Sequence, residues 1–206
     1  MKRKMFFNVM ITGILASALL SGCGKKETTP ENNFVYNDTT YKLSQGLIST
    51  SGMEDGFYYH AIFILSDGFK VVWETDNPQM VDSLAGRGEL IGFFLIDKSE
   101  DGPEDGTYNA IVISSKSLTL PTPFTWARGM AYIDYTEIGD ETLGQKINLT
   151  KGTIKVKNNG NNNLELTINV TSDKNVSLNG FFKGTFKSFI LDDKKSLDVK
   201  TPFRRM

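Results

Sequence analysis

The chain offers few side chains for nucleophilic catalysis or for zinc binding. Its 206 residues include one histidine, His60, and one cysteine, Cys23. A Ser–His–acid arrangement would have to use His60 as its base, yet His60 lies within the aromatic and aliphatic run Phe57–Leu65. A packed or half-exposed strand residue is the simpler interpretation. Structural zinc sites use several Cys or His ligands, so such a site is excluded, and we predict no catalytic residue and no enzymatic activity.

A cluster of acidic residues lies between positions 97 and 105. Asp97, Ser99 and Asp101 stand at alternate positions, as do the first oxygen ligands of an EF-hand calcium loop. The twelfth position is Tyr108, where that loop requires a bidentate glutamate. We therefore prefer a solvated loop between two strands. Calcium at these three residues is the one cofactor that the sequence leaves open.

Aromatic residues provide a candidate binding surface. Trp73, Trp126 and Tyr132 could form a platform for sugar rings, with Arg128 fixing the hydroxyl groups. Core packing is the competing interpretation, because buried aromatic rings supply much of the apolar area of a domain. Trp126 fits a core least well, since it follows a proline-containing loop and precedes Arg128 and Gly129.

The N-terminal segment determines where the chain is expected to go. Basic residues at positions 2–4 precede an apolar run that ends at Leu20, which is typical of a secretory signal peptide. The run of about 16 residues is shorter than the roughly 20 that a membrane-spanning helix needs. The residues Leu20-Ser21-Gly22-Cys23 resemble the lipobox of bacterial lipoproteins. This resemblance implies that residues 1–22 are removed and that acyl chains on Cys23 bind the chain to membrane lipid.

Composition limits the class of partner. Removing residues 1–22 takes away three basic residues and no acidic one, which leaves 20 basic and 24 acidic residues. This mildly acidic balance argues against nucleic acid as a partner. A mature chain of about 184 residues is long enough for one domain.

Alternating apolar residues and frequent turn residues predict an all-β fold. We expect an antiparallel β-sandwich of roughly ten strands, with a lipocalin-like closed barrel as the alternative. The strands Phe57–Leu65 and Phe69–Trp73 should form a hairpin across Asp67-Gly68. Residues 74–89 are expected to be irregular, with a short helical turn allowed around Gln79–Leu84. The other expected strands are 34–36, 40–43, 46–50, 90–96, 107–114, 126–135, 146–157, 164–170 and 176–190.

These patterns divide the chain into four parts. Residues 1–22 form the signal peptide, 23–33 a flexible tether, 34–191 the β-domain and 192–206 a charged tail. The tether is polar and contains a proline but has no apolar periodicity, as is usual for a flexible linker.

Three stretches carry a family resemblance. They are Phe34–Leu43 with Gly46 beyond it, Asp105–Tyr108, and the closing strands 151–156, 164–168 and 178–186. Their order is similar to that in a group of small uncharacterised outer-membrane lipoproteins of Bacteroidetes. The resemblance implies a lipid-anchored domain resembling a β-sandwich, on the periplasmic or cell-surface face of the outer membrane, and it supplies no catalytic residue.

Three classes of function follow as hypotheses. The first is a non-catalytic, lipid-anchored binding or accessory module, whose partner is a polysaccharide or another envelope protein. The second is a structural or adhesive subunit that pairs through an exposed edge strand. The third is a hydrolase, which requires a named acid whose substitution abolishes turnover.

Overall fold

The computed structural model describes residues 30–52, 56–111, 122–138 and 141–190. The chain divides into two units, Met1–Pro30 and Glu31–Met206, and the described strands belong to the second. The described residues contain no helix of the length and apolarity needed to cross a membrane. The strands are β1 Asn33–Tyr36, β2 Thr39–Lys42, β3 Gln45–Gly52, β4 Tyr58–Leu65, β5 Phe69–Trp73, β6 Val81–Asp97, β7 Gly106–Ala110, β8 Thr125–Ile138, β9 Glu141–Asn158, β10 Asn163–Ser172 and β11 Ser177–Ser188.

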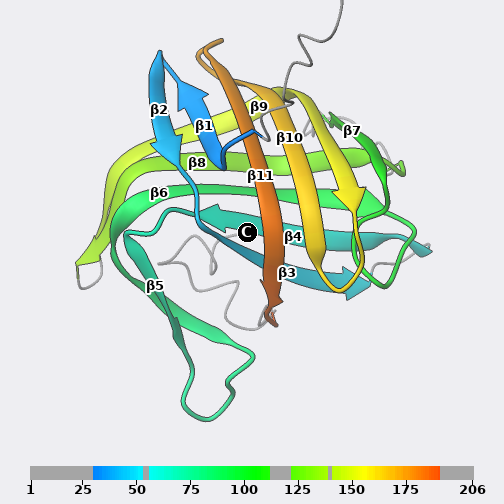
Figure 1. Cartoon of the computed structure of the whole chain (residues 1–206), viewed down its shortest axis with the longest axis horizontal. Helices are drawn as coiled ribbons and strands as arrows, with labels where there is room; N and C mark the ends of the chain where they lie inside the picture. The colour runs from blue at the N-terminus through cyan, green and yellow to red at the C-terminus, as the bar shows by residue number, and fades with distance from the viewer. Residues whose placement is uncertain (1–29, 53–55, 112–121, 139–140, 191–206) are drawn as a thin grey trace, which may run out of the picture. The chain divides into compact units, whose positions relative to one another are not determined.

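The predicted all-β, sandwich-like fold is confirmed. Hydrogen bonds join the strands into one sheet in the order β10-β9-β7-β8-β6-β4-β3-β11-β1-β2, with β5 attached to β6. All pairings are antiparallel except β3–β11 and β7–β8. Strands β10 and β11 pair with each other and cross over β4 and β3, as Figure 1 shows. One wall therefore contains β3, β4, β6 and β8, and the facing wall contains β10, β11, β1 and β2.

Strand β9 belongs to both walls. Its first half pairs with β8 up to Leu149, and its second half pairs with β10 from Leu149 onward. The backbone changes direction near Gly152, which has φ 106°, a conformation that favours glycine. The β9–β10 pairing joins the walls along one side, and the β11–β3 pairing joins them along the other. Walls that are joined by paired strands along both sides are also a feature of a closed barrel, the alternative fold that the sequence left open.

Two expectations about the segment after β4 are wrong. Strand β5 pairs with residues 81–86 of β6 and not with β4, whose partner is the later part of β6. Residues 81–89, expected to be irregular, are the first half of this 17-residue strand. The backbones approach closely where β5 begins, because a Cβ built on Gly68 would lie 2.0 Å from the Arg87 carbonyl oxygen. Glycine at this position allows β5 to cross onto β6.

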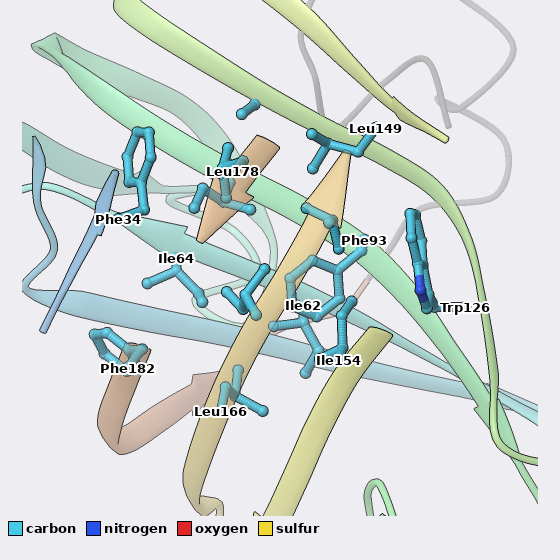
Figure 2. Packing of buried hydrophobic residues seen from close by; sticks show 14 of the residues in the cluster. Phe34, Ile62, Ile64, Phe93, Trp126, Leu149, Ile154, Leu166, Leu178 and Phe182 are labelled. Atoms are coloured by element: carbon cyan, nitrogen blue, oxygen red, sulfur yellow. The ribbon is translucent and has the colours of Figure 1, made fainter. Parts of the chain in front are cut away.

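The main core lies between the two walls. Figure 2 shows Ile62, Ile64 and Phe93 from one wall facing Leu166 and Phe182 from the other. All five are at most 1% exposed. Burial of such side chains stabilises the fold by about 1.5–3 kcal/mol each relative to exposure.

A second apolar cluster covers the outer face of β4 and β6. It includes Phe63 and Leu65 from β4, Leu90 from β6, Phe69 from β5 and Phe189 after β11. Both faces of β4 are therefore buried at its end, as the apolar residues on both of its faces indicate. This explains why the sequence there runs as a continuous apolar stretch rather than as an alternation.

Candidate functional site

The chain's single histidine belongs to a hydrogen-bonded network that joins strands β3, β4, β6 and β7. His60 on β4 and Asp97 at the end of β6 are both 0% exposed, and so is Tyr108 on β7. His60 is directly opposite Leu95 in the β4–β6 register. Asp97 lies two residues farther along β6, which places its side chain diagonally next to His60 on the same face. Thr50 is directly opposite His60 on β3 and completes what we call the His60 network.

The Asp97 carboxylate is the centre of the network. Its Oδ1 lies 3.0 Å from His60 Nε2 and accepts a hydrogen bond from the Ser99 backbone N–H at 2.8 Å. Its Oδ2 accepts from the Glu104 backbone N–H at 3.0 Å and from the Tyr108 hydroxyl. An ionised carboxylate has about four acceptor positions, so the four donors fill them all. The loop after β6 is thus fastened at both ends to a single side chain.

The partners of His60 define which of its nitrogens carries hydrogen. An ionised carboxylate can only accept, so Nε2–H donates to Asp97. In the neutral imidazole, Nδ1 then accepts from the Thr50 hydroxyl, whose Oγ1 lies 3.0 Å away. Thr50 is exposed. The network therefore connects an exposed hydroxyl to a carboxylate in the core through one buried imidazole.

Burial and hydrogen bonding act in opposite directions on the acid. Burial raises the pKa of the Asp97 carboxyl, but the hydrogen bonds from His60, Tyr108, Glu104 and Ser99 outweigh it and hold the pKa below the ordinary value of 3.8. Burial and the bond to Asp97 raise the pKa of the Tyr108 phenol far above its ordinary value of 10.0. The carboxylate is therefore ionised and the phenol protonated at neutral pH, which are the states that the hydrogen bonds need.

The hypothesis of a calcium site at Asp97, Ser99 and Asp101 does not agree with this geometry. Both Asp97 oxygens already accept protein hydrogen bonds, and Ser99 takes part as a backbone donor to one of them. Asp101 is exposed. The described part of the chain contains no group of three or more His, Cys, Asp or Glu side chains that could hold a metal ion.

The order Thr–His–Asp is that of a catalytic triad, but the histidine is out of reach. In a triad, the histidine takes the proton of the nucleophile and then delivers it to the leaving group. It must therefore contact the substrate. His60 is 0% exposed, and its two nitrogens already face Thr50 and Asp97. The geometry is suited to holding β3, β4, β6 and the following loop together.

The predicted aromatic platform is not assembled. Trp126 is 1% exposed in the main core, whereas Tyr132 is 8% exposed in the outer cluster. Trp126 Nε1 donates to the Gly152 carbonyl at 3.1 Å, and a Cβ on Gly129 would lie 2.5 Å from the Trp126 ring. The ring thus fits inward because residue 129 has no side chain.

The remaining platform residues lie apart from Trp126. Trp73 is half-buried on β5, with Lys187 Nζ 3.7 Å from its ring centroid. Arg128 is exposed on β8 with φ 51°. Trp73 and Tyr132 both belong to the outer cluster, whereas Trp126 lies in the main core, so the four side chains do not form one platform. Cys23 lies outside the described residues, so its acylation stays a prediction.

The His60 network was not predicted from the sequence. Two signals were present: a polar ring inside an apolar strand, and an acid that ends the buried strand Leu90–Ile96. A buried imidazole needs hydrogen-bond partners, so these signals could have predicted an acid next to His60. The choice of Asp97 nevertheless requires the register of β4 against β6, which is a tertiary property.

Comparison with known proteins identifies no relative. No protein-family model, curated protein or solved structure matches the chain.

Proposed function

We propose that this chain is a lipid-anchored, non-catalytic binding or accessory module of the bacterial cell envelope. Acyl chains on Cys23 would hold it in the outer membrane, and the polar segment up to β1 would act as its tether. Two or more acyl chains are needed for stable anchoring, because one alone gives only marginal membrane binding. The rigid double-walled domain would present its surface to a partner.

The observation that supports a non-catalytic function is the His60 network, whose groups are already bonded to one another. The one histidine is completely buried, and the four acceptor positions of its carboxylate partner are filled by donors of the protein. A general base needs access to the proton that it removes. These groups are instead suited to stabilising the fold around the loop after β6.

Lipid analysis of the exported protein tests the anchoring. We expect the mature protein to begin at Cys23, to carry fatty acids by mass spectrometry, and to sediment with the outer membrane. Cys23→Ala should release it from the membrane fraction. A product that retains residues 1–22, or a Cys23 without fatty acid, would refute the proposal.

A hydrolase is the second candidate, and the Thr50–His60–Asp97 order is the specific observation that favours it. In this case Thr50 would be the nucleophile, and Thr50→Ala would abolish turnover while leaving the fold intact. A screen with ester, amide and glycoside substrates distinguishes the candidates. Turnover by the natural chain that Thr50→Ala removes would replace the non-catalytic proposal.

A further inference from the structure

One outer face of the sheet carries two rows of side chains that lie directly opposite one another on neighbouring strands. In the first row, Lys42, Asn33, Phe181, Thr167, Lys155 and Thr107 are directly opposite one another on β2, β1, β11, β10, β9 and β7. In the second row, the corresponding residues are Thr40, Val35, Asn179, Asn169, Thr153 and Asn109. We call these twelve residues the polar face.

The alternation of the strands directs the polar face away from the core. Phe34, Leu166, Ile154 and Tyr108 are neighbours of these residues along their strands, and each is 0% exposed in the main core. Successive side chains of a strand point to opposite faces. Accordingly, the residues of the polar face are exposed or half-buried.

The composition of the polar face is unlike that of the whole chain. The chain has a net charge of −1, whereas the polar face contains two lysines and no acidic residue. Five asparagine and threonine side chains of its second row offer amide and hydroxyl groups. Within the described residues, none of the twelve side chains has a hydrogen bond or an ion pair with another residue, so these groups are available to a ligand.

The spacing within the first row suits an extended ligand with repeated negative charges. Neighbouring strands lie about 4.8 Å apart, so Lys42 and Lys155 are separated by about 19 Å across four strand steps. Phe181 lies midway, two steps from each lysine. Its half-buried ring offers an apolar surface between two cations.

We propose that the polar face binds a linear acidic polysaccharide that runs across the strands. Carboxylate groups of the polymer would pair with Lys42 and Lys155, and a sugar ring would lie against Phe181. Sugar hydroxyls would bond to the asparagine and threonine row. This inference rests on the proposed binding function and names its site and ligand class.

An acidic polysaccharide fits the polar face better than an anionic lipid surface. Anionic lipid headgroups attract clustered basic residues, and each basic residue near the membrane contributes about 1 kcal/mol to binding. Within the polar face two lysines stand far apart among ten uncharged residues. In the adjoining row Glu165 lies between Lys183 and Lys157, and it forms an ion pair with Lys183 at 3.1 Å. Amide and hydroxyl groups in a continuous row match a ligand rich in hydroxyl groups along its length.

Binding of the purified lipidated protein to immobilised polysaccharides tests the inference. The probes are polygalacturonate, alginate and hyaluronate, with neutral dextran for comparison. We expect binding to at least one acidic polymer and weaker binding at higher salt, because exposed charge pairs are screened. The double variant Lys42→Gln/Lys155→Gln should weaken that binding about tenfold, as the loss of two exposed charge pairs implies.

Two further variants separate the polar face from general charge. Lys70→Gln removes the same charge from an exposed lysine on β5 and should change the affinity less than about twofold. Phe181→Ala should weaken binding without removing any charge. Circular dichroism of each variant confirms that the fold is retained.

Several outcomes would overturn the inference. These are no binding to any of the three acidic polymers, equal binding to dextran, or equal losses for Lys70→Gln and for the double variant Lys42→Gln/Lys155→Gln. Binding to phosphatidylglycerol vesicles in place of the polymers would assign the face to lipid. If Cys23 is acylated and no polymer binds, the anchoring stands and this inference alone fails.

Discussion

Replacing Asp97 by asparagine tests whether the charge of the His60 network stabilises the fold. The amide keeps the volume of the acid but has one acceptor oxygen in place of two. If the amide nitrogen takes the Oδ2 position, the Tyr108 hydroxyl can accept from it after rotating its own hydrogen toward the Glu104 carbonyl, 3.1 Å away. The Glu104 backbone N–H is then left without an acceptor, which costs about 1–3 kcal/mol.

The two bonds at Oδ1 weaken as well. His60 and the Ser99 backbone would donate to a neutral oxygen, and each such bond stabilises the fold by about 1 kcal/mol less than one to a charged group. Relief from desolvation does not compensate, because the hydrogen bonds already hold the pKa of Asp97 below its ordinary value. We therefore expect Asp97→Asn to lower the free energy of unfolding by about 3–5 kcal/mol.

Equilibrium urea unfolding, followed by tryptophan fluorescence, measures this change. Asp101→Asn is the matched control, because Asp101 is exposed in the same loop, and it should change stability by less than about 0.5 kcal/mol. A loss below about 1 kcal/mol for Asp97→Asn would refute the reasoning, since the contribution of Asp97 to stability would then not depend on its charge.

The pH dependence provides a second check on the same residue. A carboxyl whose pKa is lower in the folded state stabilises the protein above its unfolded pKa, and this stabilisation is lost as pH falls through the folded pKa. The advantage of the natural chain over Asp97→Asn should therefore be constant near neutral pH and shrink below about pH 3.8. A difference that is independent of pH between 7 and about 3 would contradict the assignment.

Three other substitutions test the network, the core and the β5–β6 crossing by the same unfolding measurement. Tyr108→Phe removes a donor to the buried carboxylate and should cost about 1.5–3 kcal/mol; an unchanged stability would show that the hydroxyl is dispensable. Leu166→Ala, in the main core at 0% exposure, should cost about 2–5 kcal/mol, against less than about 0.5 for Leu143→Ala at an exposed site. Equal losses for the two leucines would contradict the two-walled packing. Gly86→Ala should cost about 1–3 kcal/mol, because Gly86 has φ 107° and an added Cβ would lie 2.2 Å from the Gly68 carbonyl oxygen. Tolerance of alanine there would argue against the close crossing.

The sequence by itself determined the all-β class and most strand positions, because these depend on local patterns. Leu164, Leu166, Ile168 and Val170 alternate with polar residues, and the structure buries all four. The asparagine-rich segment between β9 and β10 forms a turn in which Asn161 and Asn162 adopt positive φ, as short polar side chains tolerate.

Only the tertiary structure decided which strands pair and which polar groups meet. The Asp67-Gly68 turn suggested that β5 pairs with β4, yet both β4 and β5 pair with β6, each along a different part of its length. Likewise, His60 and Asp97 are 37 positions apart in the sequence. The register of β4 against β6 brings them into contact. Local periodicity reports which face of a strand is apolar, but it carries no information about which other strand that face will meet.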